Sequence, residues 1–227
     1  MVDRRVEGLP LEQVLGWAEL CGQRIEIDPG VFVPRRRTEL LAREAGALAR
    51  PGAVAVDLCC GSGAVGGALA SQVEGVELHA ADVDRVAARC ARRNLPAAAV
   101  VYEGDLFEAL PETLRGRIDV LVANVPYVPT GEIDLMPREA RLHEPRAALD
   151  GGGDGLDVLR RVSSEAPGWL APGGHVLVEV SERQAVPAGQ AFAADGLIPR
   201  SVRSPDLGAT VVVGTKPSGS LAAMTVA

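Results

Sequence analysis

Residues 55–70 read AVDLCCGSGAVGGALA, and this stretch decides the fold. An apolar run typical of a buried strand ends at Asp57, a loop supplies Gly61 and Gly63, and small residues then open a helix. Glycines at such a turn let the backbone approach a ligand at the carboxyl edge of a parallel sheet. A glycine loop alone is weak evidence, since several nucleotide-binding folds share it and some glycines only permit close packing. The stretch therefore predicts a strand-loop-helix unit whose loop can hold a ligand.

Strand-like and helix-like runs alternate through the rest of the chain. We expect strands at 53–58, 76–81, 98–103, 118–125 and 175–180, and helices at 64–72, 85–94 and 182–195. Two further β-rich runs, LIPRSVRS and ATVVVGTKP, predict an antiparallel pair that closes the sheet. This alternation predicts an α/β fold with a doubly wound, Rossmann-like sheet and helices on both faces.

The chain is expected to have three parts: a small N-terminal appendage at 1–37, the α/β domain at 38–217 and a flexible tail at 218–227. Within the appendage, GQRIEIDPGVFVPR predicts a β-hairpin that turns at Asp28, Pro29 and Gly30.

Composition places the chain among soluble globular proteins. Its 227 residues and 47% hydrophobic content are sufficient for one packed domain. No stretch approaches the roughly 18 apolar residues of a membrane span, and MVDRRVEGLP lacks the apolar centre of a signal peptide. We therefore expect a cytoplasmic protein with no membrane partner. Trp17 and Trp169 fall on apolar helical faces and are expected in the core.

The net charge and the residue types limit the kinds of partner and ligand that we expect the protein to bind. A net charge of −7 argues against strong nucleic-acid binding, because Lys and Arg supply that affinity. The histidines are scattered, without Cys, Asp or Glu at ligand spacing, so we predict no metal site. The cysteines show neither zinc-site nor disulfide spacing and are expected to be reduced thiols, mostly buried: Cys21, Cys59, Cys60 and Cys90.

Two more acids stand where later strands end. Asp82 follows the second strand, where a carboxylate can accept hydrogen bonds from both hydroxyls of a ribose. The competing role of helix cap is better filled by Asp84, which directly precedes the next helix. Asp105 follows the third strand and could accept from an adenine amino group while Leu106 contacts the ring. Capping the next turn is the alternative for Asp105.

Three acids at successive strand ends, with Asp-x-x-x-Gly-x-Gly in the first loop, are similar to the arrangement in class I methyltransferases that use S-adenosylmethionine. The sulfonium of that cofactor is positive, so an acidic site suits it better than it suits the phosphates of a dinucleotide. The resemblance implies S-adenosylmethionine as the cofactor. The residues implied to bind it are Asp57, Gly61, Gly63, Asp82, Asp105, Leu106 and Asn124.

The fourth strand ends in NVPY, residues 124–127. Alone, this stretch is compatible with a strand that ends in a proline turn. Beside the acids it resembles the Asn-Pro-Pro-Tyr motif of methyltransferases that act on planar amide or exocyclic amine nitrogens. Such a nitrogen is a poor nucleophile because its lone pair is delocalised, so a site must orient it and accept hydrogen bonds from its protons. The implied catalytic set is Asn124, the backbone carbonyl of Val125, the turn at Pro126 and the ring of Tyr127.

Two longer stretches are more specific than the glycine loop. EPRAALDGGGDGLDVLRRVSSEAPGWLAPGGHVLVEV at 144–180 and DPGVFVPRRRTELL at 28–41 resemble the protein-glutamine N-methyltransferase family, which modifies the Gly-Gly-Gln loop of peptide release factors. The resemblance runs from about Gly8 to Pro217. It implies transfer of a methyl group to the side-chain amide nitrogen of a glutamine in a protein partner, with a release factor among the candidates.

Three departures from that family point to a different or narrower protein substrate. The family's N-terminal helical domain is almost wholly missing, and Val125 replaces a proline. The family pattern Pro-Arg-Pro-Glu-Thr-Glu reads Pro-Arg-Arg-Arg-Thr-Glu at 34–39. Arg36 and Arg37 could therefore meet an acidic partner, or they could lie in a solvated loop.

Two further functions stay open on sequence alone. A nucleic-acid amine methyltransferase would use the same Asn-x-Pro-Tyr geometry, but it predicts a basic channel or an added RNA-binding module, and the sequence shows neither. A catalytically silent cofactor-binding scaffold would account for the lost proline. Intact Asp57, Asp82 and Asn124 argue against such decay.

Overall fold

A computed structural model describes residues 5–6 and 8–219, which contain one seven-stranded sheet and one two-stranded sheet. The large sheet consists of β3 (Val54–Leu58), β4 (Glu77–Asp82), β5 (Val100–Glu103), β6 (Ile118–Ala123), β7 (Leu170–Val180), β8 (Ile198–Ser204) and β9 (Ala209–Thr215). Their order in space is β5-β4-β3-β6-β7-β9-β8. Strands β3 to β7 run parallel, while β9 lies antiparallel to both β7 and β8. The predicted α/β sheet and its closing antiparallel pair are confirmed.

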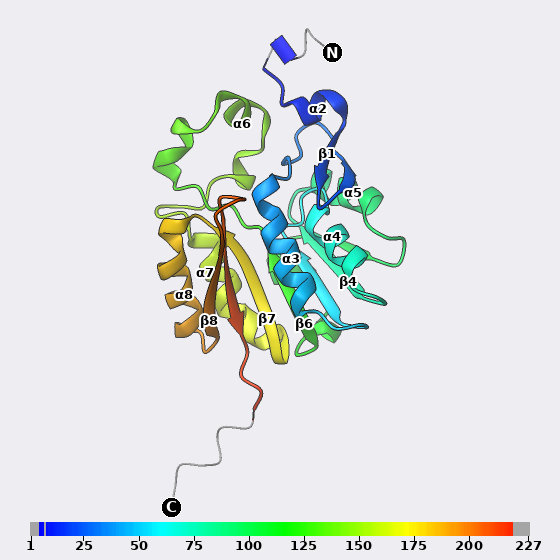
Figure 1. Ribbon diagram of the computed structural model, residues 1–227, viewed down its shortest axis with the longest axis vertical. Helices are drawn as coiled ribbons and strands as arrows, with labels where there is room; N and C mark the ends of the chain where they lie inside the picture. Colours follow the sequence, from blue (N-terminus) through cyan, green and yellow to red (C-terminus); the bar gives the residue numbers. More distant parts are fainter. Residues whose placement is uncertain (1–4, 7, 220–227) are drawn as a thin grey trace, which may run out of the picture.

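Helices cover both faces of this sheet (Figure 1). On one face lie α3 (Glu39–Leu48), α4 (Ala64–Gln72) and α5 (Arg85–Asn94), and on the other α7 (Asp157–Trp169) and α8 (Ala185–Ala194). The shorter helices are α2 (Leu11–Leu15) and α6 (Arg138–His143), and the 3-10 turns are η1 (Arg36–Thr38), η2 (Leu106–Ala109), η3 (Glu112–Leu114), η4 (Thr130–Leu135), η5 (Arg146–Ala148) and η6 (Glu182–Gln184). Helices α2 and α6 lie at one end of the molecule (Figure 1).

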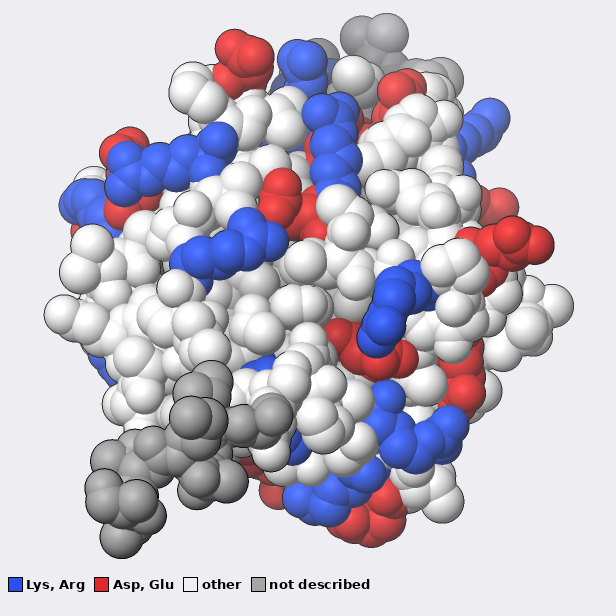
Figure 2. Space-filling model, turned by 60° about the horizontal axis from the view of Figure 1, so that its bottom comes forward, with Lys and Arg blue, Asp and Glu red and all other residues white. Residues whose placement is uncertain are grey.

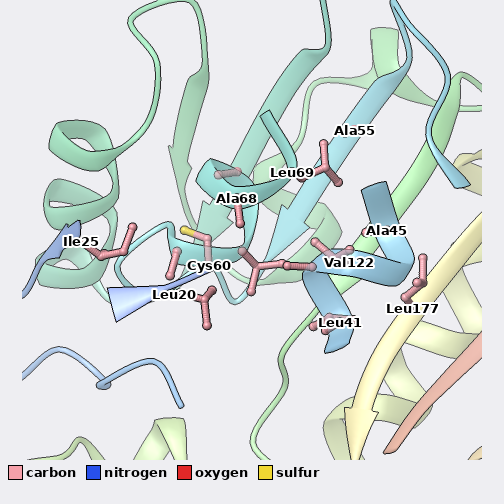
Figure 3. Close-up of a cluster of buried hydrophobic side chains, with 14 of the residues drawn as sticks. Leu20, Ile25, Leu41, Ala45, Ala55, Cys60, Ala68, Leu69, Val122 and Leu177 are labelled. Atoms are coloured by element: carbon pink, nitrogen blue, oxygen red, sulfur yellow. The ribbon is translucent and has the colours of Figure 1, made fainter. Parts of the chain in front are cut away.

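Each face of the sheet has its own apolar cluster, because alternate residues of a strand point to opposite sides. On β6, Val122 belongs to the cluster beneath α3 and α4, whereas its neighbour Leu121 belongs to the cluster beneath α7 and α8. Figure 3 shows the first cluster, in which Leu41 of α3 and Leu69 of α4 are buried near Val122. The central strands of the sheet are therefore buried on both sides, whereas the edge strand β8 is largely exposed.

The two-stranded sheet is a β-hairpin of β1 (Trp17–Leu20) and β2 (Gln23–Glu26). The sequence predicts a hairpin here, but two details are wrong: its turn is not at residues 28–30, and Trp17 is not helical. The chain turns instead at Cys21 and Gly22, whose φ angles of 52° and 74° give the left-handed pair that a tight two-residue hairpin turn requires. Leu20 and Ile25 of the hairpin point into the first apolar cluster (Figure 3).

Several smaller predictions can be compared with the structure. Trp169 is 2% exposed and stacks on Phe107, so its core position is confirmed. All four cysteines are free, two of them buried and two partly buried. Within the described residues no helix is both long and apolar enough to cross a membrane. The division at residue 37 stays a prediction, and residues 220–227 of the predicted tail lie outside the described part of the chain.

Candidate active site

A pocket opens at the carboxyl ends of β3, β4 and β6. The strand order reverses between β3 and β6, because the chain first builds outward to β5 and then returns to build toward β7. Open α/β sheets bind their ligands at such a switch point. The structure brings four of the predicted cofactor residues together in the lining: Asp57, Gly61, Asp82 and Asn124.

Asp57 lies near the end of β3 with only 1% of its surface exposed. Its Oδ2 accepts a hydrogen bond from the backbone N–H of Gly66 in α4, at 2.8 Å. Position 66 is tight, because an added Cβ would lie 3.0 Å from the same carboxylate oxygen. Burial raises the pKa of Asp57 to about 7, with the Gly66 N–H opposing the rise and Asp82 adding to it. This carboxyl group therefore titrates near neutral pH.

Asp82 ends β4 and fixes the glycine loop. Its Oδ2 accepts from the backbone N–H of Gly61 and its Oδ1 from that of Asp84, both at 2.8 Å. Burial raises the pKa of Asp82, while these two N–H groups lower it. Asp84 accepts from the backbone N–H of Val86 and so caps α5, which confirms the predicted cap.

The two predicted glycines serve different purposes. At Gly61 φ is +56° and an added Cβ would meet no heavy atom within 4 Å, so the space beside it is open to a ligand. At Gly63 φ is +78° and an added Cβ would lie 3.0 Å from Leu95 and 3.2 Å from Ala91, so this glycine allows α4 and α5 to pack closely. Gly63 is accordingly absent from the pocket lining.

Asp105 and Leu106 are not among the residues that line the pocket. Asp105 Oδ2 accepts from Arg161 Nη2 at 2.7 Å, and the Asp105 side chain is 44% exposed. It makes no capping bond to η2, so the capping alternative is not observed. Leu106 is 5% exposed and belongs to the second apolar cluster. Their roles toward an adenine ring stay predictions.

Two segments far apart in the sequence complete the pocket wall, one within residues 30–38 and the other at 145–148. Arg35 joins them, because its Nη2 donates to both carboxylate oxygens of Glu144, at 2.6 and 2.7 Å. The backbone N–H of Val33 also donates to Glu144, at 3.3 Å. Burial raises the pKa of Glu144, while Arg35 and Val33 lower it. Glu144, the first residue of the Glu-Pro-Arg motif, thus holds the arginine-rich segment at 34–37 in place over the pocket.

A second, smaller pocket adjoins the first and shares three residues with it: Phe32, Asn124 and Ala148. Val125 and Tyr127 line this second pocket, whereas Pro126 lines the first. Among the described residues, none forms a hydrogen bond with the Asn124 side chain. Val125 is 1% exposed and packs in the second apolar cluster, which leaves chiefly its backbone to meet a substrate. Asn124 therefore stands at the junction of two pockets with its amide free.

The hydroxyl of Tyr127 is held by a buried acid. It donates to Glu179 Oε1 at 2.9 Å, and Arg37 Nε donates to the same oxygen at 3.0 Å. The guanidinium of Arg37 also lies over the Tyr127 ring, with Cζ 5.6 Å from the ring centroid. Burial raises the pKa of Tyr127, and Glu179 raises it further. Tyr127 thus remains a neutral hydrogen-bond donor with a fixed ring.

The glycine-rich stretch 151–155 supports the NVPY loop. An added Cβ at Gly151 would lie 2.7 Å from the carbonyl oxygen of Pro126, and one at Gly155 would lie 2.3 Å from that of Tyr127. Gln184 Nε2 donates to the same Tyr127 carbonyl at 2.9 Å. These contacts require glycine, and they show that the family-like Gly-Gly-x-Asp-Gly-Leu motif serves the site through backbone packing.

Three site residues escaped the sequence analysis: Glu144, Glu179 and Gln184. Glu179 had a usable signal, because VLVEV places one acid near the end of an otherwise apolar strand, as at Asp57 and Asp82. Arg36 and Arg37 are both exposed, as the solvated interpretation predicts, but Arg37 also forms an ion pair with the buried Glu179. Arg37 and Glu179 are far apart in the sequence, and no local sequence pattern predicts that they pair.

Within residues 5–6 and 8–219, no group of three or more His, Cys, Asp or Glu side chains is placed to hold a metal ion. The strand order and an acid-lined pocket at the switch point define a Rossmann-like α/β fold of the methyltransferase type. The family described as "Methyltransferase small domain" matches residues 24–166. The chain belongs to this family.

Several relatives of named activity resemble most of the chain. A release factor glutamine methyltransferase of Geobacter sulfurreducens is 39% identical over 188 residues, which are 82% of this chain. A 4-amino-L-phenylalanine/4-methylamino-L-phenylalanine methyltransferase of Streptomyces pristinaespiralis is 38% identical over 203 residues, or 86% of this chain and 69% of the relative. The chain spans 65% of the length of the Geobacter relative, slightly less than two thirds.

A solved structure agrees with this placement. It is the release factor-specific protein-(glutamine-N5) methyltransferase of Alicyclobacillus acidocaldarius, which is 27% identical and has a TM-score of 0.54. The likeness covers 85% of this chain and 99% of that one.

Proposed function

We propose that this protein transfers a methyl group from S-adenosylmethionine to the side-chain amide nitrogen of a glutamine in a protein substrate. The observation that carries the proposal is the position of Asn124, which lines both pockets and has no hydrogen-bond partner among the described residues. A methyl donor in the first pocket and an amide in the second would meet at this residue. A cytoplasmic location is part of the proposal.

The first pocket suits the cofactor by the chemistry of its lining. Asp82 and Asp84 contribute negative charge, Asp57 adds to it above neutral pH, and the open space beside Gly61 permits close approach to the backbone. Asp82 already accepts two backbone N–H groups, yet its carboxylate has lone pairs left for ribose hydroxyls. When bound, S-adenosylmethionine supplies an electrophilic methyl group on a positive sulfonium. The protein contributes orientation of that group and favourable electrostatics.

The second pocket suits a planar nitrogen. The Asn124 oxygen can accept a hydrogen bond from an amide N–H, which orients the nitrogen lone pair and stabilises positive charge as a bond forms. The Tyr127 ring, fixed by Glu179 and by the glycine-rich stretch 151–155, offers a flat face for the amide. The nitrogen loses a proton after methyl transfer, and Asn124 is not basic enough to keep it, so water is the final acceptor.

The relatives support a nitrogen atom as the methyl acceptor. They do not determine whether that nitrogen belongs to a protein or to a free amino acid. One relative is named for a glutamine of a release factor and another for the amino group of an aromatic amino acid. Both nitrogens have lone pairs delocalised into a planar group, so one site geometry serves both. Methylation of a free aromatic amine is therefore the second candidate function.

Nucleic-acid methylation and a silent scaffold have less support. The net charge of −7 argues against strong affinity for nucleic acid, and on the face that Figure 2 presents Lys and Arg are interspersed with Asp and Glu. A silent scaffold has no need of a free amide at the junction of two pockets. Strong nucleic-acid binding is thus no part of the proposed function.

The proposal can be tested with methyl-labelled S-adenosylmethionine and four acceptors: a release factor, a Gly-Gly-Gln peptide, total RNA and 4-amino-L-phenylalanine. Mass spectrometry then locates the label. We expect a single methyl group on a glutamine side chain, and transfer lowered by roughly 100-fold or more with Asn124→Ala. Label in RNA alone, or in no acceptor despite cofactor binding, would contradict the proposal. Label in the aromatic amine alone would support the second candidate.

A further inference from the structure

The two adjoining pockets are lined by opposite charges. The first is lined by three acids, Asp57, Asp82 and Asp84, and by no Lys or Arg of the described residues. The second is lined by Arg35 and Arg37, and by no Asp or Glu of the described residues. A cationic methyl donor matches the first pocket. The second pocket therefore favours a substrate that brings negative charge close to the nitrogen that is methylated.

Arg37 is the arginine of this pair that remains available. Arg35 is committed to Glu144, because one Nη atom contacts both oxygens of a carboxylate that has no exposed surface. Arg37 donates to Glu179 through Nε alone, at 3.0 Å, and its side chain is 45% exposed. Within the described chain, neither Nη group of Arg37 donates to a second carboxylate.

The shape of the guanidinium decides what it can still bind. Its five N–H groups lie in one plane, and the edge that carries the two Nη groups matches a carboxylate. With Nε occupied by Glu179, a second carboxylate can bind along that edge. Arg37 lies over the ring of Tyr127 and lines the same pocket as Asn124. An anion on Arg37 is therefore held next to the site of methyl transfer.

We propose that Arg37 is a specificity residue that binds a carboxylate of the substrate beside the nitrogen oriented by Asn124. This inference rests on the proposed methyl transfer to a planar nitrogen and adds the charge of the acceptor. The carboxylate belongs either to an acidic residue next to the target glutamine or to the main chain of a free amino acid. Arg36, which precedes it, is exposed and lines neither pocket, so it has no such role.

Calorimetry on the protein loaded with S-adenosylhomocysteine measures this preference without requiring catalysis. One pair of peptides carries a single glutamine flanked by either Glu or Ser. A second pair is 4-amino-L-phenylalanine and its carboxamide, which lacks the carboxylate. We expect the carboxylate-bearing member of one pair to bind about tenfold more tightly, the scale of one partly exposed charge-assisted hydrogen bond. The pair that shows the preference identifies the source of the carboxylate.

Variants then test whether Arg37 causes the preference for the carboxylate-bearing ligand. In Arg37→Gln the ratio of the two dissociation constants should fall to about one, whereas Arg36→Gln, which removes the same charge one residue away, should keep it. Arg37→Lys keeps the positive charge but lacks the planar edge of the guanidinium. It should therefore retain part of the difference between the two dissociation constants. Glu179→Gln frees Arg37 from its ion pair and should keep or increase the ratio. If Arg37→Gln does not fold, Arg37→Gln/Glu179→Gln replaces it and should also lose the ratio.

Four results overturn the inference: no preference in either pair, a preference kept in Arg37→Gln, an equal loss in Arg36→Gln, or a loss in Glu179→Gln as complete as in Arg37→Gln. The last would mean that Arg37 only positions Tyr127 through Glu179. Labelled-methyl transfer is measured on the same samples. A preference that depends on Arg37 without any methyl transfer contradicts the proposed function and leaves the binding assignment standing, so the two failures are distinguishable.

Discussion

Asn124 differs from the neighbouring polar groups of the site in having no internal partner among the described residues. Asp57, Asp82, Tyr127 and Glu179 all make hydrogen bonds within the protein. A polar group left free at the junction of two pockets has its whole hydrogen-bonding capacity available to a ligand, whereas a bonded group has already used part of its capacity within the protein. The proposed methyl transfer therefore assigns its orienting hydrogen bond to this one amide side chain.

Asn124→Ala is expected to lower methyl transfer by roughly 100-fold or more, because it removes a positioned hydrogen-bond acceptor in the transition state. Fold and cofactor affinity should stay nearly unchanged, since no internal bond is lost. Single-turnover transfer, calorimetry with the cofactor and the melting temperature are measured on one sample. A stability loss of about 1 kcal/mol with transfer at the parent rate would instead mean that Asn124 only caps the strand end.

Asp82→Ala should weaken cofactor binding by tenfold or more. The change removes the acceptor for ribose hydroxyls, each worth on the order of 1.5 to 3 kcal/mol before compensation, and it releases the N–H of Gly61. Asp84→Ala is the comparison: Asp84 caps α5 and lines the same pocket, so the change should cost about 1 kcal/mol of stability and weaken cofactor binding less than Asp82→Ala does. Equal cofactor affinity in Asp82→Ala and the parent, measured by calorimetry, would rule out the ribose contact.

Asp57 should make the ligand-free protein less stable as the pH rises. Its pKa is about 7 when folded against 3.8 for the ordinary side chain, so between about pH 4 and 7 the folded protein holds a proton that the unfolded chain has released. That contribution is complete below pH 4 and disappears through pH 7, on the order of 4 kcal/mol at about 1.4 kcal/mol per pKa unit. Urea unfolding at pH 5 and pH 8 measures about two thirds of it, roughly 3 kcal/mol. Asp57→Asn should flatten this dependence, and an unchanged slope would contradict the account.

At the scale of elements, the NVPY loop depends on a second loop behind it. Gly151 and Gly155 approach the carbonyl groups of Pro126 and Tyr127 too closely for any side chain. Val128 also forms a bridge with Asp150, which ties the two loops together as a short parallel pair. The geometry of the active loop is thus set by backbone contacts.

Gly155→Ala should reduce methyl transfer by roughly tenfold or more while cofactor affinity is kept. Its φ of +79° disfavours alanine, and the added Cβ would lie 2.3 Å from the Tyr127 carbonyl, so the NVPY loop must move. Gly153→Ala is the matched control in the same stretch, because its added Cβ meets nothing within 4 Å and its φ is not positive. Equal effects of the two changes would mean that the loop tolerates the displacement.

The sequence predicts those features of the structure that a local residue pattern determines. Strands β3, β4, β5 and β6 and the polar residues at their ends follow from apolar runs and turn residues, and the strands lie within two residues of the expected bounds. The hairpin turn was misplaced because Asp-Pro-Gly at 28–30 is the stronger turn signal. That turn forms, with the Val31 N–H bonded to the Asp28 carbonyl at 3.1 Å, but no strand of the described chain directly follows it.

Ion pairs between distant segments have no local pattern. Arg37 meets Glu179 across 142 residues, and Arg35 meets Glu144 across 109. A sequence shows that such arginines and acids exist, and their pairing depends on how the helices pack over the sheet. The charge of the second pocket could therefore be described only from the structure.

At the scale of the whole molecule, the sheet provides the floor of the site and two distant segments provide its walls. The Arg35–Glu144 pair is a polar link between those walls, and Glu144 is buried without exposed side-chain surface. Breaking a buried pair leaves an uncompensated charge, which is far more harmful than loss of a surface pair. The retention of a bound cofactor should therefore depend on this link.

Glu144→Gln should speed cofactor release by severalfold, because the segment around residues 30–38 loses its charged anchor while Asp57 and Asp82 remain in place. The association rate should change little, since it depends on the open floor of the pocket. We also expect a loss of stability of about 2 kcal/mol, the scale of a hydrogen bond to a charged group, because the Arg35 side chain left unpaired is 32% exposed and partly hydrated. Stopped-flow binding and urea unfolding measure the two effects. Glu139→Gln is the control from the neighbouring helix α6, because the Arg5–Glu139 pair is 48% and 44% exposed and should contribute little to either quantity. If Glu144→Gln released the cofactor no faster than Glu139→Gln, the pair would stabilise the fold without closing the pocket.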